Sequence, residues 1–245
     1  MPDRKDIHHD VWLSGEFAEA EGRGELSIAY QPIVDMATRR VVGAEALMRW
    51  HHGTRGAVSP NTFIGLAEPE GLLHGPGTFA MQTALDDLAA WRAASKSARD
   101  LFMSVNVSAS QLDDQGLTDV LHDALDSRGL DLAALHLELT ETAPPPGPSG
   151  TDTLNRLHLA GFHISIDDFG TGYSSLLRIQ HLPCRSLKID KAFTIDLLTS
   201  NTSRAIVQST LQLARDMGLD VIAEGIETEA QQAFLNESGC PLGQG

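Results

Sequence analysis

The segment Phe162-His163-Ile164-Ser165-Ile166, followed directly by Asp167-Asp168, indicates the fold of this chain. It is a short apolar run with a high proportion of β-forming residues, and it ends in two acids. Similar short runs recur on both sides of it and alternate with helical patterns. Strands that are apolar along most of their length are typical of a parallel sheet with both faces buried.

Eight such strands are expected along the chain. They are Leu26–Ile33, Val41–Leu47, Leu101–Val107, Leu135–Leu139, Phe162–Ile166, Ser186–Ile189, Asp220–Ala223 and a strand that begins near Leu242. Helices are expected over Thr62–Ala67, Gly77–Ala94, Gln111–Arg128, Thr151–Ala160, Ser174–His181 and Arg204–Met217. Eight strand–helix units in a chain of this length predict a (β/α)₈ barrel of the TIM type, and a doubly wound open sheet is the alternative.

The two ends of the chain predict departures from a regular barrel. Residues 8–25 have an amphipathic helical pattern that ends near two glycines, so residues 1–24 are expected to form a linker helix before a domain of residues 25–245. The expected eighth strand is incomplete, because the chain ends at Gly245. This predicts a barrel that is not fully closed and is therefore less stable.

Composition narrows the possible functions. The 245 residues carry a formal net charge of −15, from 33 acidic and 18 basic residues, which argues against binding to duplex nucleic acid. Cys184 and Cys240 are too few for a disulfide framework, so reduced thiols in the cytoplasm are expected. No apolar run approaches the length of a membrane span, so this segment is not expected to contact a membrane, although a longer parent protein could be anchored in one.

Polar side chains stand at the ends of six successive expected strands. They are Glu45, Asn106, Glu138 with Glu141, Asp167 with Asp168, Lys188 with Asp190, and Glu224 with Glu227. In a barrel these ends meet at one rim, where the active sites of this fold lie. Any single acid after a strand is more often a helix cap or a solvated loop residue. The repetition favours a site for Mg²⁺ or Mn²⁺, because both ions prefer oxygen ligands.

Seven blocks, in order along the chain, resemble the EAL family of cyclic di-GMP phosphodiesterases. They are Tyr30-Gln31-Pro32-Ile33, Glu45-Ala46-Leu47 continuing to Arg49, Asn106-Val107-Ser108, Glu138-Leu139-Thr140-Glu141, Asp167-Asp168-Phe169-Gly170-Thr171-Gly172-Tyr173-Ser174-Ser175, Lys188-Ile189-Asp190 and Glu224-Gly225-Ile226-Glu227-Thr228, with Gln244-Gly245 closing the chain. The resemblance runs from about residue 25 to the last residue. It implies a TIM-like barrel and metal-dependent hydrolysis of cyclic di-GMP (c-di-GMP) to linear 5′-pGpG.

The same resemblance implies a role for each matching residue. Two divalent cations, Mg²⁺ or Mn²⁺, are expected, with Glu45, Asn106, Glu138 and Asp167 as ligands of the first. Asp167 would bridge to the second ion, where Asp168 and Glu224 contribute.

Other matching residues would act around those ions. Lys188 would hold or polarise the attacking water, and Gln244 would support the network of water and metal. The expected substrate-binding residues are Gln31, Leu47, Arg49 and Glu227. Glu141 is expected to anchor the loop over Asp168–Ser175.

Two further function classes remain open from the sequence. The first is a non-catalytic receptor for c-di-GMP, although the complete set of acids together with Lys188 favours the enzyme. The second is a domain that interacts only with proteins, which fits worst. The resemblance also implies a homodimer and fusion to a sensor or cyclase-type domain in a longer cytoplasmic protein.

Overall fold

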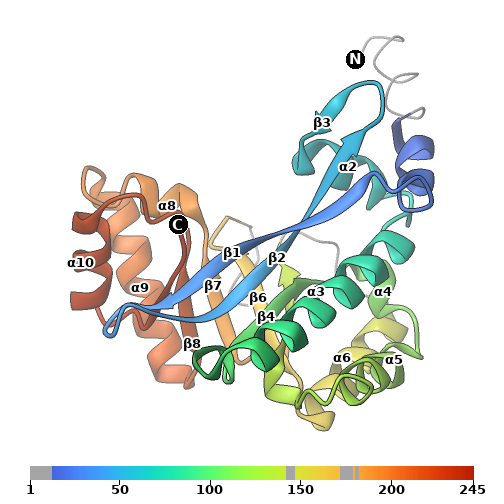
Figure 1. Ribbon diagram of the computed structural model, residues 1–245. Coiled ribbons are helices and arrows are strands. Elements are labelled where there is room, and N and C mark those ends of the chain that lie inside the picture. Colours follow the sequence, from blue (N-terminus) through green and yellow to red (C-terminus); the bar gives the residue numbers. More distant parts are fainter. Residues whose placement is uncertain (1–12, 142–146, 172–178, 180–181) are drawn as a thin grey trace.

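A closed barrel of eight strands forms the centre of the molecule (Figure 1). The computed structural model describes residues 13–141, 147–171, 179 and 182–245. Around the barrel the strand order is β1-β9-β8-β7-β6-β5-β4-β2, and pairing of β1 with β2 closes the ring. β3 lies outside the ring and pairs only with β2. The TIM-like barrel expected from the sequence is therefore confirmed.

The elements have the following bounds. The strands are β1 (Leu26–Asp35), β2 (Arg40–His52), β3 (Gly56–Val58), β4 (Phe102–Asn106), β5 (Leu135–Thr140), β6 (His163–Phe169), β7 (Ser186–Ile189), β8 (Asp220–Ala223) and β9 (Leu242–Gly243). The helices are α2 (Pro60–Ala67), α3 (His74–Ala94), α4 (Ala109–Leu112), α5 (Leu117–Asp126), α6 (Pro148–Ala160), α8 (Lys191–Ile195), α9 (Asn201–Met217) and α10 (Glu229–Glu237), with 3₁₀ turns at Lys96–Ala98 and Leu132–Ala134.

The first two strands depart from the expected parallel arrangement. β1 runs antiparallel to both β2 and β9, whereas all the other pairings of the ring, from β2–β4 to β8–β9, are parallel. A tight turn joins β1 to β2, in which the Thr38 backbone N–H and hydroxyl both donate to Asp35 Oδ1 at 2.7 Å. A parallel crossover needs a dozen or more residues, so this short connection can only make a hairpin.

The barrel closes despite its very short last strand. Gly243 lies opposite Val34 of β1 and opposite Ala223 of β8, so the two-residue β9 joins both neighbours. The expectation of an unclosed barrel was wrong, because two residues of pairing are enough to complete the ring.

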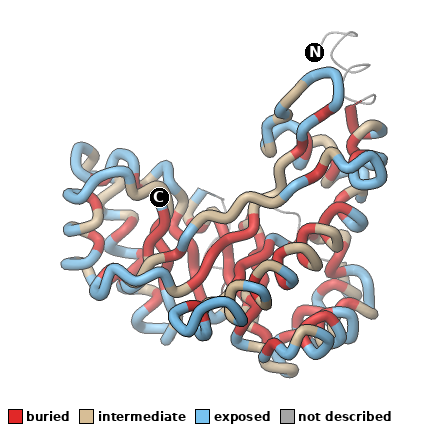
Figure 2. Tube along the Cα trace, viewed as in Figure 1, coloured by how far each residue is buried: buried red, intermediate tan, exposed pale blue. Residues whose placement is uncertain are grey.

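Helices cover the outside of the barrel and bury two separate cores. One core lies between α3, α5, α6 and the strands β2, β4, β5 and β6, and the other between α9, α10 and the strands β6 to β8. The strands are accordingly the most deeply buried part of the chain (Figure 2).

Several helices differ from the sequence expectation. The single helix expected over Gln111–Arg128 is two helices, because Asp114 Oδ1 accepts from the Gly116 N–H at 2.8 Å and forms a turn between them. The strand β3 and the helices α8 and α10 were not anticipated. Most of the helix expected over Ser174–His181 lies outside the described residues.

A third core lies in a lobe beside the barrel. Residues 13–20 are helical and pack on the ends of β1 and β2 that extend beyond the ring (Figure 1). Phe17 stacks on Phe63 at a centroid distance of 4.9 Å and meets Trp50 edge-on at 5.3 Å. The Trp50 indole donates to Glu25 Oε2 at 3.0 Å. The expected linker helix is thus packed against the domain, and its role as a linker stays a prediction.

None of the helices in the described ranges combines the length and apolar character needed to cross a membrane.

Candidate active site

Five carboxylate groups gather at the carboxyl ends of the barrel strands. They belong to Glu45 on β2, Glu138 on β5, Asp167 and Asp168 on β6, and Glu224 directly after β8. Strand alternation places them there: Ala44 and Ala46 on β2 pack outward into the helical core, so Glu45 between them points into the barrel. Glu138 is likewise flanked by the outward-facing Leu137 and Leu139.

Lys188 connects four of these carboxylates. Its ammonium nitrogen lies 2.6 Å from Glu224 Oε1 and 2.8 Å from Glu138 Oε2. It also lies 3.1 Å from Glu45 Oε2 and 3.2 Å from Asp167 Oδ1. The side chain of Lys188 is fully buried, so the central positive charge is enclosed by acids.

A bulge in β6 brings two adjacent acids to the same rim. Neighbouring residues of a regular strand face opposite sides, but the pairing of β6 with β7 shifts register between Ile166 and Phe169. Asp168 has a positive φ of 56°. This conformation is costly for a non-glycine residue and is found most often at functional sites. Its N–H donates to Asp167 Oδ1 at 2.9 Å, which helps to hold the turn.

The carboxylates form two overlapping groups, each close enough together to hold a metal ion. Oxygen atoms of Glu45, Glu138 and Asp167 all lie within 4.8 Å of one another, as do those of Asp167, Asp168 and Glu224. Asp167 belongs to both groups. The bridging role that the sequence resemblance implies for Asp167 stays a prediction.

Most of these acids have raised pKa values. Burial is the largest cause at Glu138, and the neighbouring charges of Glu45 and Asp167 add to it. Burial and Asp167 raise the pKa of Asp168 to about 7, with a further contribution from a hydrogen bond with Asp190. The pKa of Glu224 is also raised to about 7, mainly by burial, against the opposing effect of Lys188.

The pKa values of Glu45 and Lys188 shift against the effect of burial, because each side chain faces groups of opposite charge. Burial would raise the pKa of Glu45, but Lys188, Gln244 and Asn106 outweigh it and lower that pKa. Burial would lower the pKa of Lys188, but Glu138 and the other acids raise it well above its ordinary value. Lys188 is therefore a protonated hydrogen-bond donor.

Two amide side chains complete the polar cluster. Asn106 Nδ2 donates to Glu45 Oε1 at 3.2 Å, and Gln244 Nε2 donates to Glu45 Oε2 at 2.5 Å. Within the described ranges, Glu138 Oε1 and Gln244 Oε1 are buried and have no hydrogen-bond partner. Buried oxygens are rarely left without a partner, so these two are suited to a cation or a bound water.

Glu141 hydrogen-bonds to the backbone around the end of β6. Its Oε2 accepts from the Gly170 N–H at 2.8 Å, and its own N–H donates to the Asp167 carbonyl at 2.9 Å. These two hydrogen bonds join Glu141 to Asp167 and Gly170, and its role as the anchor of the loop stays a prediction. Residues 172–178 of that loop lie outside the described residues.

A cavity of about 250 Å³ opens beside the carboxylates. Its walls include Leu47, Arg49, Ile64, Leu73, Val107 and Gln111, together with Glu45, Asn106 and Asp167 of the polar cluster. The cavity is therefore apolar on one side and borders the carboxylates on the other. Such a shape suits a ligand that combines a flat aromatic base with a phosphate.

The remaining predicted substrate residues are Gln31 and Glu227. Gln31 is half-buried and lies opposite Glu45 in the β1–β2 register. Glu227 is exposed and belongs to neither carboxylate group.

Asp190 was expected only as one of the polar residues at strand ends, and its side chain hydrogen-bonds to Asp168. The signal was present, since Lys188 and Asp190 are two residues apart and alternation points both toward the same side.

The fold and the site together define a TIM-type barrel with a buried lysine and clustered carboxylates at its carboxyl-terminal rim. The chain belongs to the EAL domain family, whose sequence model matches residues 15–245. The resemblance drawn from the seven sequence blocks is thereby confirmed.

Two relatives from Pseudomonas aeruginosa match nearly all of the chain. The cyclic di-GMP phosphodiesterase NbdA is 38% identical over 237 residues, which is 96% of this chain and 30% of that protein. The bifunctional diguanylate cyclase/cyclic di-GMP phosphodiesterase MucR is 39% identical over 234 residues, which is 95% of this chain and 34% of that protein. The chain thus spans about a third of the length of such curated relatives.

Solved structures agree with the fold. The MucR phosphodiesterase in complex with c-di-GMP superposes with a TM-score of 0.86 at 39% identity, covering 96% of this chain and 94% of that one. The EAL enzyme Bd1971, with cAMP and cyclic di-GMP bound, has a TM-score of 0.91 at 34% identity. That match covers 98% of this chain and 65% of the Bd1971 chain.

Proposed function

We propose that this chain is a phosphodiesterase that hydrolyses c-di-GMP to linear 5′-pGpG with two divalent cations, Mg²⁺ or Mn²⁺. The observation that carries the proposal is the pair of carboxylate groups that share Asp167, with protonated Lys188 beside them. Relatives named as c-di-GMP phosphodiesterases, and a c-di-GMP complex of one of them, support the choice of substrate.

The donor set fits two divalent cations. Five carboxylates and the Lys188 ammonium carry a formal charge of −4, which two divalent cations would cancel. Glu45, Glu138 and Asp167 would hold one ion with Asn106, and Asp167, Asp168 and Glu224 would hold the other. When bound, such ions neutralise a phosphodiester and lower the pKa of a coordinated water.

The protein's own groups would orient the reaction. Lys188 donates hydrogen bonds, so it would hold the attacking water or a phosphate oxygen, and it cannot act as the base while protonated. Asn106 and Gln244 fix the two oxygens of Glu45 from both sides. The cluster is therefore preorganised before substrate arrives.

The cavity would position the substrate. Leu47 and its apolar neighbours would cover a guanine base, and Arg49 would contact a phosphate oxygen. Gln31 and Glu227 would make polar contacts to the nucleotide, and Glu141 would keep the loop at Gly170 in place.

The reaction balances with water as the only co-reactant. The water oxygen forms a bond to phosphorus, and the bond from phosphorus to the ribose 3′ oxygen breaks. That oxygen leaves with a proton, and the water oxygen stays on the new 5′ phosphate.

The setting of the domain is also part of the proposal. Fusion to a sensor or cyclase-type domain is supported by the coverage of about a third of MucR, a bifunctional protein. Homodimerisation is expected from the family resemblance. A cytoplasmic place is in keeping with Cys184 and Cys240, which are both free thiols.

Chromatography of a reaction with c-di-GMP tests the proposal. We expect pGpG to appear with Mg²⁺ or Mn²⁺ and to be absent with EDTA. Glu45→Ala should abolish the product, because it removes a residue that contacts Lys188, Asn106 and Gln244. Metal-dependent binding of c-di-GMP without product would favour the receptor function, and full activity of Glu45→Ala would contradict the assigned site.

A further inference from the structure

Lys191 is an exposed cation at the rim of the barrel. It is the first residue of α8 and follows β7, the strand that carries Lys188. Within the described part of the chain, Lys191 has no acidic partner within 4.0 Å. An exposed lysine is ordinarily a solvated surface charge. A role in ligand binding for Lys191 therefore depends on its position relative to the carboxylates.

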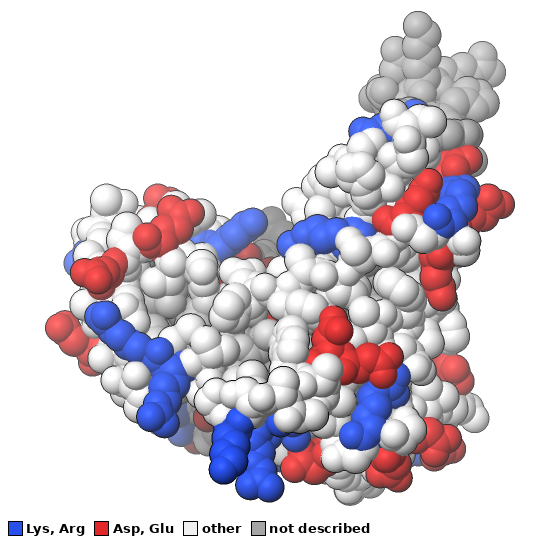
Figure 3. Space-filling model, in the orientation of Figure 1, with Lys and Arg blue, Asp and Glu red and all other residues white. Residues whose placement is uncertain are grey.

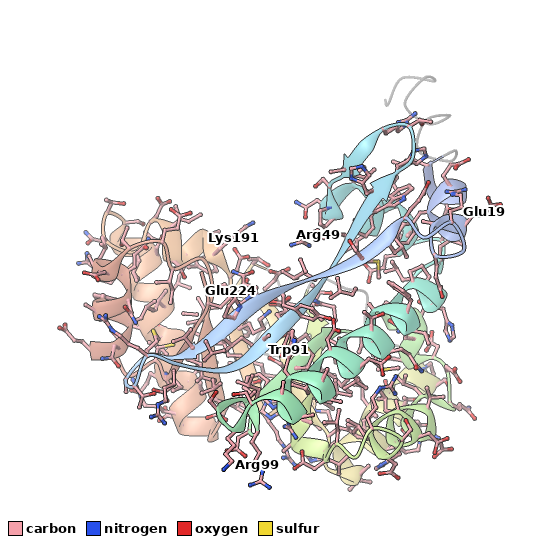
Figure 4. The ribbon with its side chains drawn as sticks, viewed as in Figure 1. Glu19, Arg49, Trp91, Arg99, Lys191 and Glu224 are labelled. Carbon is pink, nitrogen blue, oxygen red and sulfur yellow. The ribbon has the colours of Figure 1, made fainter. Side chains whose placement is uncertain are left out.

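Lys191 and Arg49 stand on opposite sides of the barrel mouth. In the closed ring, three strands separate β7 from β2 in either direction, so these two strands face each other across the barrel. Figure 4 shows the two side chains on either side of the opening, with Glu224 below it. Basic side chains also flank this opening in the space-filling view (Figure 3). The central carboxylates therefore lie between two cations.

The backbone around Lys191 is held in place by the loop after β8. A Cβ atom at Gly225 would lie 2.6 Å from Lys191 Cβ, so the loop can approach this closely only with glycine at that position. Gly225 also has a φ of +65°, which favours glycine. Because Gly225 directly follows Glu224, the contact fixes the origin of the Lys191 side chain next to a carboxylate of the centre.

The substrate supplies a reason for this second cation. c-di-GMP has two phosphodiesters, and only one can be at the centre during cleavage. The cavity and Arg49 lie on the β2 side of the centre, so a dinucleotide with one base in the cavity would extend its other half toward β7. In a chain of net charge −15, a phosphodiester there would be repelled unless a cation met it.

We propose that Lys191 binds the second, non-scissile phosphodiester of the dinucleotide and thereby positions the first at the centre. This inference rests on the proposed hydrolysis of c-di-GMP. It makes Lys191 a determinant of specificity for a substrate with two phosphodiesters over one with a single phosphodiester.

Steady-state kinetics of Lys191→Gln test the assignment. We expect the KM for c-di-GMP to rise by about tenfold, as for the loss of one charge-assisted hydrogen bond, with kcat changed by less than about threefold. Lys191→Arg should restore the KM. The increase in KM should shrink at high salt, because salt screens an exposed ion pair. With bis(p-nitrophenyl) phosphate, which has a single phosphodiester, the substitution should have no such effect.

Lys96→Gln is the matched control. Lys96 is exposed near the opposite end of the barrel, and its substitution changes the net charge by the same amount. An unchanged KM in Lys191→Gln, or an equal rise in Lys96→Gln, would overturn the assignment while the unmodified protein still makes pGpG. No turnover by the unmodified protein would instead remove the proposed function, and the role of Lys191 with it.

Discussion

Replacing Glu224 by glutamine should stabilise the metal-free protein at neutral pH while weakening the proposed metal site. Glu224 is half of a close contact with Lys188, yet burial and the neighbouring acids raise its pKa from 4.5 to about 7. The environment therefore disfavours the ionised form. Glutamine keeps the size and an acceptor oxygen but has no charge to desolvate.

The magnitude follows from linkage between proton binding and folding. The folded pKa is above the unfolded value, so ionisation of Glu224 costs nothing below pH 4.5. Its cost grows as the pH rises to about 7 and is then constant. A shift of this size corresponds to about 3 kcal/mol, since each pKa unit is about 1.4 kcal/mol. For a chain of this length, that is roughly 6–12 °C in Tm.

Thermal unfolding in EDTA, measured from pH 4.5 to pH 8, checks this expectation. Glu224→Gln should match the unmodified protein at the acid end and exceed its Tm at pH 8, and Mn²⁺ should reverse the order because only the unmodified protein keeps all its ligands. Glu237→Gln, at an exposed position on α10, is the control for the same chemical change. A Tm lowered equally at both pH values would show instead that the contact with Lys188 stabilises the fold.

Three further predictions concern residues around the centre. Lys188→Ala should destabilise the metal-free protein at pH 8 by about 3–5 kcal/mol in urea unfolding, because buried carboxylates lose their counter-charge; unchanged stability would contradict the buried ion pairs. Glu141→Ala should cost about 1–2 kcal/mol and lower kcat roughly tenfold, because the Gly170 N–H loses its acceptor; an unaffected metal-dependent rate would argue against the anchor. Gly225→Ala should lower stability by about 2 kcal/mol or more, since its Cβ would overlap Lys191 and its φ is positive; a Tm equal to that of the unmodified protein would refute the close approach.

The acids of the centre could be located from the sequence because each lies at or near the end of a predicted strand. Glu45 and Glu138 each interrupt an apolar run, and in a barrel such positions share a rim. The repeated pattern therefore predicted both the fold and the gathering of the carboxylates. What it could not give was the orientation of Asp168, since that depends on the bulge in β6 and on a positive φ.

Other features of the fold depend on the lengths of connections and strands, which the hydrophobic pattern does not reveal. The antiparallel hairpin of β1 and β2 follows from a connection too short for a helix, a signal that was present but not used. A strand was expected from Leu242, but its closure of the ring was not foreseen, because two residues carry no periodic pattern. Lys191 also gave no signal, because its position opposite Arg49 exists only once the ring is closed.

The lobe with its own aromatic core makes β2 a mechanical link. Trp50 belongs to the lobe core, Arg49 to the cavity wall and Glu45 to the carboxylate centre, all on one continuous strand. From Glu45 to Trp50 is about 17 Å of extended chain. A displacement of the helix at residues 13–20 would therefore either bend β2 or move Arg49 with it. Strand β2 would therefore transmit a displacement of the N-terminal helix to the cavity that Arg49 lines.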